Sequence, residues 1–413
     1  MGFRYCFVLN PWACHWQRDK VVLAGSCWAN LQPPGSKMSH VCPRSTLPAA
    51  APPLEDDDLL SEILIRLPPQ PSSLPRVSAV CKRWCGLVSD PGFARRFRRR
   101  NPPPLLGFFG QGFDGIDFQP TMDPPNCIPS GRFSMLLDGR FRPKLLGCRH
   151  GLVLVLDKKL KQVVVWDPFS GDRHSLAVPP RFDASIAPIV GSVLRPVGDA
   201  HHFQVILAGS HKIQQHTQAF ACIYSSKTSV WSGVISTLLP SMDYRSSRPF
   251  MFFSTMPAVL AGDSLYWTLT GISPVILQFD LHRRSLAVIH LPADTFAPSK
   301  QFTVMQADGG GLGLLSVSGL TAQLWRRNTD SDGVASWVLG RTIELDKLLF
   351  QNSEVHKHSL VITGFAERNN VVFMYTLMGL FMLQLESLQF KKCSEPSMLS
   401  CYHPFEGVYA ADK

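Results

Sequence analysis

The chain has 413 residues and a formal net charge of +10 at pH 7, a length that accommodates one large domain together with a small one. Hydrophobic residues make up 45% and charged residues 17% of the sequence, which excludes a mainly disordered chain and a coiled coil. Five of the positive charges lie within the six residues 95–100, so the net charge alone does not indicate a nucleic-acid-binding protein.

The first 53 residues show no sustained hydrophobic period and end in the Pro/Ala-rich segment TLPAAAPP. We expect residues 1–53 to form a disordered extension, without the continuous apolar core of a signal peptide. Met38 begins a short polar lead into the next segment, and we hypothesise that residues 1–37 are dispensable. The eleven cysteines show no metal or disulfide framework, so we expect reduced cysteines and a cytoplasmic or nuclear protein.

Residues 54–100 predict a small helical module. One apolar helix face has the i, i+3, i+4, i+7 spacing and consists of Leu60, Ile63, Leu64 and Leu67. Three acidic residues at 56–58 supply a cap for this helix, and the prolines at 68–69 end it. A second stripe predicts another helix, with Pro75 in its first turn: Val77, Val80, Cys81, Trp84 and Val88. Two helices this short cannot bury both stripes against each other, so the module needs a partner surface.

This segment resembles the F-box, particularly that of grass proteins. The resemblance is carried by Leu59, Leu60, Glu62, Ile63, Leu64, Arg66, Leu67, Pro68, Leu74, Val80, Cys81, Lys82, Arg83, Trp84, Leu87, Asp90, Pro91 and Phe93. F-boxes dock on a Skp-type adaptor bound to a cullin, so the resemblance implies adaptor contacts by Leu54, Leu59, Leu60, Ile63, Leu64, Leu67, Pro68, Leu74, Val80, Cys81 and Trp84. The alternative for any one of these side chains, Leu67 and Trp84 included, is a place in the core of the helical module itself.

Three prolines at 102–104 end the helical segment, because proline cannot continue a helix and favours an extended backbone. From residue 145 onward, short apolar runs with a period near two alternate with Gly, Asp, Pro and Ser. We therefore divide the chain into the extension (1–53), the F-box (54–100), a linker with the first strands (101–144) and an all-β domain (145–413).

A similar unit recurs five times in the β domain. Its anchor residues are spaced by 58, 55, 46 and 60 positions: Trp166, Tyr224, Phe279, Trp325 and Leu385. Repeats of this length with several short strands predict propeller blades, with a sixth blade shared between 105–140 and the C-terminal stretch. The expected fold is thus a small all-α F-box module followed by a kelch-like β-propeller of five or six blades. The alternative is a β-sandwich whose turns merely look alike.

The passage CRHGLVLVL…VVVWDPFSG (148–171) is similar to the F-box-associated repeats of plant F-box proteins. Together with the F-box, this similarity implies a non-catalytic substrate-receptor subunit of a Skp–cullin–F-box ubiquitin ligase, which binds its protein target through the β domain. Two alternatives stay open. One is an enzyme whose catalytic residues converge near the channel of a propeller, and the other is an adaptor-bound scaffold that does not promote ubiquitination.

The sequence offers no persuasive catalytic or cofactor site, and we expect no cofactor or metal. The Gly-rich stretch 308–319 leads into a strand instead of a helix and lacks the lysine of a phosphate-binding loop. The histidine pairs 201–202 and 356/358 lack carboxylates at metal-site spacing. The longest uncharged apolar run, 371–383, is shorter than a membrane span and fits two strands and a turn. The basic run at 95–100 fits a solvated helix end, so neither a membrane nor a nucleic-acid partner is expected.

We expect target recognition to lie in the loops of the propeller, because its strands are used for blade packing. The candidate loops are 167–173, 225–229, 282–284, 326–332 and 367–370. Their charged candidates are Asp172, Arg173, Lys227, Arg283, Arg284, Arg326, Arg327 and Arg368. The abundance of arginine suggests an acidic or phosphorylated target segment.

Overall fold

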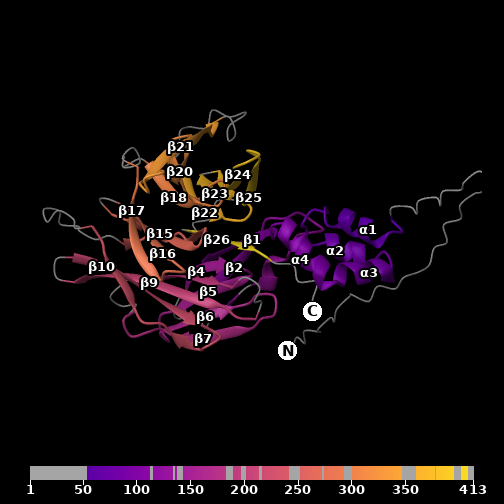
Figure 1. The fold of residues 1–413 in the computed structure, drawn as a ribbon, viewed down its shortest axis with the longest axis horizontal. Coiled ribbons are helices and arrows are strands. Elements are labelled where there is room, and N and C mark those ends of the chain that lie inside the picture. Colours follow the sequence, from indigo (N-terminus) through magenta and orange to yellow (C-terminus); the bar gives the residue numbers. More distant parts are fainter. Residues whose placement is uncertain are drawn as a thin grey trace, which may run out of the picture. The chain divides into compact units, whose positions relative to one another are not determined.

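The structure, a computed structural model, describes residues 54–111, 115–133, 135–136, 143–182, 189–196, 201–213, 216–240, 252–271, 274–292, 300–346, 360–376, 378–394 and 401–407 (Figure 1). The predictions about residues 1–53 and about His356 and His358 lie outside these residues. Within the described part, no helix is long and apolar enough to cross a bilayer.

The described residues of the F-box segment form four helices, α1 (Asp57–Leu64), α2 (Ser73–Ser78), α3 (Lys82–Ser89) and α4 (Pro91–Arg100). The start of α1 is as predicted, since the Asp56 carboxylate accepts hydrogen bonds from the backbone N–H groups of Asp58 and Leu59 at 2.9 and 3.0 Å. Asp90 caps α4 in the same way through the Phe93 N–H at 2.8 Å. The last turn of α4 carries exposed arginines, as expected for the basic run.

The predicted second helix is wrong in its continuity, because residues 79–81 separate α2 from α3. Cys81 has an extended backbone (φ −162°, ψ 168°), and its Sγ accepts the Trp84 N–H at 3.5 Å as the cap of α3. This cap satisfies an N–H that has no partner inside a helix that begins here. The break also changes the helical phase, which leaves Val80 exposed while Val77 and Val88 stay buried.

The β domain is a six-bladed propeller. The first blade contains, in spatial order, β26 (Tyr402–Glu406), β1 (Leu105–Gln111), β2 (Gly115–Pro120) and β3 (Met135–Leu136). The second contains β4 (Lys144–Arg149), β5 (Leu152–Asp157), β6 (Gln162–Trp166) and β7 (Arg173–Ala177). The third contains β8 (Val190–Leu194), β9 (Gln204–Ile213), β10 (His216–Ser225), β11 (Val230–Trp231) and β12 (Ile235–Leu238).

The remaining three blades repeat this pattern. The fourth contains β13 (Phe252–Phe253), β14 (Val259–Ala261), β15 (Ser264–Thr270), β16 (Val275–Asp280) and β17 (Ser285–His290). The fifth contains β18 (Lys300–Gln306), β19 (Leu312–Ser318), β20 (Thr321–Thr329) and β21 (Ala335–Glu344). The sixth contains β22 (Val361–Ala366), β23 (Val371–Thr376), β24 (Gly379–Gln384) and β25 (Phe390–Ser394). A short 3-10 helix, η1 (Ser130–Phe133), follows β2.

The ring is closed by pairing of the two ends of the β domain. Strand β26, the last described strand, pairs antiparallel with β1, the first one, from Gly107 opposite Phe405 to Gly110 opposite Tyr402. Figure 1 labels β26, in yellow, next to β1, in purple. The expected sixth blade shared between 105–140 and the C-terminal stretch is therefore present.

Burial on both faces of each blade explains the strongly apolar strands. In β5 and β6, Leu154 and Val163 pack in the core between the second and third blades. Their sequence neighbours Val153 and Val164 belong to the core on the other face, toward the first blade. A strand that is covered on both faces is expected to read as a continuous apolar run rather than an alternating one. The segment VVFMYTLMGLFML likewise forms β23 and β24 rather than a membrane span.

The five repeated sequence units are the third strand, loop and fourth strand of blades two to six. In the second and fourth blades an aspartate caps this loop. Asp167 accepts the Phe169 N–H at 3.0 Å, and Asp280 accepts the His282 and Arg283 N–H groups at 2.9 and 2.7 Å. In the third and fifth blades a tryptophan ends the unit and bonds to the preceding blade, and in the fifth blade Asp330 also caps the loop. The indole Nε1 of Trp231 donates to the Ala177 carbonyl at 3.0 Å, and that of Trp337 donates to the His290 carbonyl at 2.8 Å.

Candidate functional site

The eleven predicted adaptor contacts fall into two groups in the structure. Leu60, Leu64 and Leu74 are buried in a core that the four helices form by themselves, and Leu67 and Trp84 pack against it. The other group is exposed: Leu54, Leu59, Ile63, Val80, Pro68 and Cys81. Leu59 and Ile63 are 50% and 44% exposed and lie one turn apart, so they form an apolar face of α1 that the module itself leaves uncovered.

Arg83 fastens the start of α3 to the segment that leads into α1. Its guanidinium donates to the carbonyls of Leu54 and Glu55 at 2.9 and 2.6 Å and to the Asp57 carboxylate at 2.8 Å. These bonds cap two carbonyl groups and hold Leu54 near α3. The arginine in the matched F-box motif therefore shapes the exposed apolar surface without belonging to it.

The strand order places all five predicted target loops on one rim of the propeller. We call this rim, at which the innermost strand of every blade ends, the exit rim. Because neighbouring strands are antiparallel, the loop after the first strand and the loop after the third strand of a blade both lie there. Loops 167–172, 226–229, 281–284 and 330–334 follow third strands, and loop 367–370 follows the innermost strand β22.

The charged candidates differ in their surroundings, and two of them, Arg326 and Arg327, lie in strand β20 and not in the loop that follows it. Arg173, Lys227, Arg284 and Arg326 are exposed. Asp172 accepts a hydrogen bond from the Ser170 hydroxyl at 2.7 Å inside its own loop. Arg283 lies 4.0 Å from Asp280, and Arg327 packs over the Trp337 ring at 6.0 Å. Arg368 alone among the eight lines the pocket at the central channel.

That pocket is the mouth of the channel on the exit rim, formed where innermost strands of four blades converge. Arg149, His150, Glu367, Arg368, His403 and Glu406 supply its charged and titratable groups, together with the thiol of Cys148. Backbone and apolar groups from Pro103, Pro257, Ala258, Phe365 and Pro404 complete the wall.

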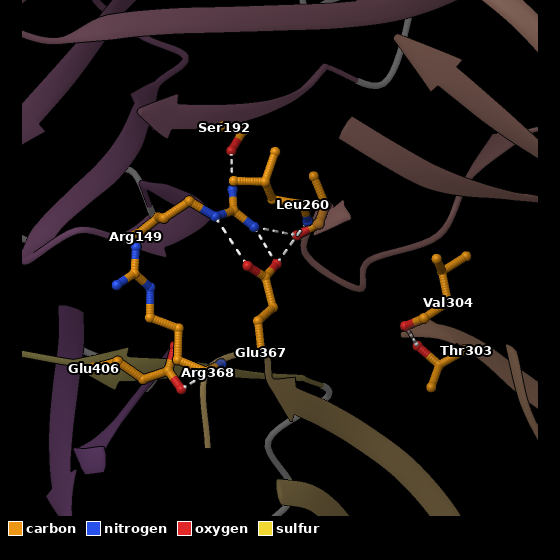
Figure 2. A network of polar contacts seen from close by, with 9 residues as sticks. Arg149, Ser192, Leu260, Thr303, Val304, Glu367, Arg368 and Glu406 are labelled. Atoms are coloured by element: carbon orange, nitrogen blue, oxygen red, sulfur yellow. Dashed lines mark hydrogen bonds and ion pairs between the residues drawn. The ribbon is translucent and has the colours of Figure 1, made fainter. Parts of the chain in front are cut away.

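A nearly buried ion pair joins four blades at the mouth (Figure 2). The side chains of Arg149 and Glu367 are 9% and 15% exposed and pair through both carboxylate oxygens. Arg149 also donates to the Ser192 hydroxyl and to the Ala258 carbonyl, and Glu367 accepts the Leu260 N–H at 2.9 Å. Every charged group of the pair thus has several partners, as burial requires.

The neighbouring His150 is held in one neutral form. Its Nδ1 accepts the backbone N–H of Arg195 at 2.9 Å. Burial, together with the nearby guanidinium groups of Arg149, Arg368 and Arg195, lowers the pKa of His150 to about 3. At neutral pH the ring is therefore uncharged with its proton on Nε2, which makes Nε2–H a hydrogen-bond donor.

Glu406 connects the last described strand to the sixth blade and to the proline linker. Its Oε1 accepts the N–H groups of Arg368 and Asn369 at 2.9 and 3.0 Å and the Asn369 side-chain amide at 2.8 Å. The same amide donates to the Pro103 carbonyl at 3.0 Å. Burial raises the pKa of Glu406 to about 7, and the negative charge of Glu367 raises it too, against the lowering effect of the Asn369 hydrogen bond.

The arrangement of these groups suits binding better than catalysis. The carboxylates of Glu367 and Glu406 are both engaged by N–H donors, and burial raises the pKa of the Cys148 thiol, which keeps it protonated. Among the described residues, no group of three His, Cys, Asp or Glu side chains could hold a metal ion. The paired histidines 201–202 lie in the loop between β8 and β9.

Sequence reasoning missed Arg149, His150, Arg195, Glu367 and Glu406 as a group. Each follows or ends an innermost strand, in the segments LLGCRHG, GSVLRP, GFAERN and HPFEG. A charged residue after the first apolar run of several repeats was the available signal. This signal can be recognised only when the first strand of each blade is known.

Comparison with known protein families decides the assignment. Residues 57–100 match the F-box-like family, and residues 144–409 match the family described as F-box protein AT5G49610-like, beta-propeller. The chain is a plant-type F-box protein of the AT5G49610-like β-propeller family. Within this F-box protein, the matched ranges coincide with α1–α4 and with the strands from β4 to β26. F-box proteins are in general non-catalytic adaptor subunits.

Two relatives of this F-box protein are themselves described as putative F-box proteins. The putative F-box protein At3g16210 of Arabidopsis thaliana is 24% identical over 241 residues, which cover 57% of this chain and 60% of the relative. The putative F-box protein At3g17490 of the same plant is 27% identical over 128 residues, or 28% of this chain and 31% of the relative. The aligned part thus spans 60% or less of each relative. Among solved structures, a chain of the nidogen/laminin complex is 10% identical with a TM-score of 0.37, covering 73% of this chain and 95% of that one.

Proposed function

We propose that this F-box protein is the substrate-receptor subunit of a Skp–cullin–F-box ubiquitin ligase. The observation that carries the proposal is the pairing of two units with separate cores, a helical module with an uncovered apolar face and a propeller with a charged rim. The α1 face, built around Leu59 and Ile63, binds a Skp-type adaptor, and the adaptor links the chain to a cullin. The exit rim binds a protein target, in the cytoplasm or the nucleus.

Adaptor binding needs the exposed face and not only a folded module. Leu64 and Leu67, which the motif suggests as contacts, lie in or against the module's core, so their replacement would also disturb folding. Replacing the exposed Leu59 and Ile63 with Asp leaves that core intact and places two carboxylates in the interface. Since each buried unpaired charge costs several kcal/mol, we expect L59D/I63D to abolish co-purification of a co-expressed Skp-type adaptor.

A matched control is Leu160→Asp, because Leu160 is 60% exposed but lies in the loop between β5 and β6, on the rim opposite the exit rim. This variant should retain the adaptor. The same pull-downs, made with proteasome inhibition and mass spectrometry, should show targets that are lost when Arg173, Lys227 and Arg284 are changed to Gln. Retention of the adaptor by L59D/I63D would refute the docking face. Adaptor binding without ubiquitin transfer to captured proteins in a reconstituted ligase would favour the scaffold alternative.

A further inference from the structure

The guanidinium groups of Arg149 and Arg368 line the channel mouth, and that of Arg195 lies close enough to act on His150; the three differ in their pairing. Arg149 is matched by Glu367, and Arg195 lies 3.5 Å from Asp167. Arg368 is different, because its backbone N–H is bound to Glu406 while no carboxylate of the described residues lies within ion-pair distance of its guanidinium. In Figure 2 the Arg368 side chain extends from loop 367–370 toward the end of β4 that carries Arg149.

The neighbour of Arg368 in the pocket wall is a second donor. His150 lies near enough for the Arg368 charge to act on it, and its Nδ1 is already occupied by the Arg195 N–H. The free donor of the ring is Nε2–H. An unpaired guanidinium and a neutral imidazole N–H in the wall of one pocket offer positive charge and directed donors, the pattern that a carboxylate or phosphate requires.

The carboxylates in the same wall do not take this role. Both oxygens of Glu367 bond to Arg149, and one of them also accepts the Leu260 N–H. Glu406 points Oε1 at three N–H donors of loop 367–370. Its other charged or titratable neighbours are Glu367 and Arg368 on that loop, Arg149 and His150 at the end of β4, and His403 on its own strand. Strand β1 contributes no titratable side chain.

We propose that the channel mouth on the exit rim binds an oxyanion of the target polypeptide, a carboxylate or a phosphate, between the Arg368 guanidinium and the His150 Nε2–H. The inference rests on the proposed receptor function and names the chemistry that its rim selects. Loops farther from the channel then contact the target residues that flank the anionic one. The ion pair of Arg149 with Glu367 holds the innermost strands around the pocket in place.

The test uses the full chain bound to a Skp-type adaptor and four degenerate nine-residue peptide libraries. Their central residue is phosphoserine, glutamate, glutamine or serine, and binding is measured by fluorescence anisotropy. We expect the libraries with an anionic centre to bind about tenfold more tightly than those with glutamine or serine, the worth of one charge-assisted hydrogen-bonded pair. If the phosphoserine library binds more tightly than the glutamate library, phosphate is the ligand. If these two libraries bind equally and both bind more tightly than the neutral ones, a carboxylate is sufficient.

Arg368→Gln should remove this preference without changing the melting temperature, because the side chain is exposed. The matched control is Arg283→Gln, which deletes one positive charge from the same rim outside the pocket and should keep the preference. Glu406→Gln retains an acceptor oxygen for the three N–H donors and removes the negative charge. It should strengthen anion binding above pH 7, where the carboxylate of Glu406 is ionised.

Two results would overturn the site: equal binding of all four libraries, or equal loss in R283Q and R368Q, which would indicate diffuse rim charge. Failure of the proposed receptor function is distinguished by its effect on target capture. In that case neither wild type nor variants capture any protein through the exit rim, whereas a wrong anion site leaves target capture intact in R368Q.

Discussion

At the level of single residues, the channel mouth holds titratable groups whose burial sets their charge. His403 on β26 is 2% exposed, and its Nε2 lies 3.5 Å from the Cys401 Sγ, whose S–H is directed to the Thr255 carbonyl at 3.1 Å. The imidazole therefore donates through Nε2, and its Nδ1 is an acceptor without a hydrogen-bond partner among the described residues. Burial lowers the pKa of His403 to about 3, with a further contribution from Lys144.

This burial predicts acid sensitivity of the propeller. Between pH 6.5 and about 3 the unfolded chain binds a proton at His403 and at His150 that the folded chain does not. The free energy of unfolding should thus be fully retained above pH 6.5 and fall as the pH drops, by about 1.4 kcal/mol per pH unit for each histidine. Glu406 acts in the opposite direction between pH 4.5 and about 7, because its pKa is raised in the folded state.

The measurement is urea unfolding of wild type and His403→Gln from pH 5 to pH 8. We expect the variant to lose most of the net acid dependence between pH 6.5 and pH 5, whatever its stability at pH 8, because the opposite contributions of His150 and Glu406 then nearly cancel. An unchanged pH slope would show that His403 is protonated in the folded protein.

The sequence predicted some features of the functional residues and not others. The apolar i, i+3, i+4 spacing of α1 was visible because helix periodicity follows directly from side-chain order. The sequence does not distinguish the buried side chains of this helix from the exposed ones. Leu60 and Ile63 belong to the same motif, yet they are 0% and 44% exposed. That distinction depends on where α3 and α4 pack, and neither helix position is encoded locally.

At the level of elements, the blades contain two kinds of repeated unit, both of which are visible in the sequence. The aspartate-capped units and the tryptophan-ended units both connect third to fourth strands. The period of the repeat therefore predicted the propeller. The prediction of one helix along the stripe from Val77 to Val88 was wrong, because a cap at Cys81 divides this segment into α2 and α3.

The tryptophan-ended units predict a measurable link between neighbouring blades. Trp231→Phe and Trp337→Phe each keep an aromatic ring but remove the indole N–H that bonds to Ala177 or His290 of the preceding blade. Each should lower the free energy of unfolding by about 0.5–1.5 kcal/mol, the usual net worth of one hydrogen bond. Urea unfolding followed by far-ultraviolet circular dichroism measures the change.

Trp325 provides the matched control for this substitution. Its Nε1 is buried and has no hydrogen-bond partner among the described residues, so Trp325→Phe loses no such bond and removes an unsatisfied donor. It should cost less than either of the other two variants. If all three cost the same, the effect comes from loss of ring size and not from the contact between blades.

At the level of the whole molecule, the F-box helices and the propeller have separate hydrophobic cores. The core of the four helices contains residues from 60 to 97 and none from the β domain. The propeller, by contrast, depends on both ends of its own segment, because the innermost strand of its first blade is β26 and the next is β1. The sequence analysis included a sixth blade shared between 105–140 and the C-terminal stretch, whereas the choice between five and six blades needed the complete strand order.

This division predicts the effect of removing β26. A chain that ends at residue 400 loses a strand that pairs along β1 and contributes Tyr402 and Phe405 to the cores on either side of the first blade. It also loses Glu406, which holds loop 367–370 and, through Asn369, the linker at Pro103. Without β26 the edge of β1 is left unpaired, and the propeller loses the closure that protects its strands.

We expect the truncated chain to lose the cooperative thermal transition of the β domain yet still to co-purify with a Skp-type adaptor. A chain that ends at residue 407 keeps β26 and is the control, which should retain both. Loss of adaptor binding in the shorter chain alone would mean that the F-box needs the closed propeller, and the two units would not be independent.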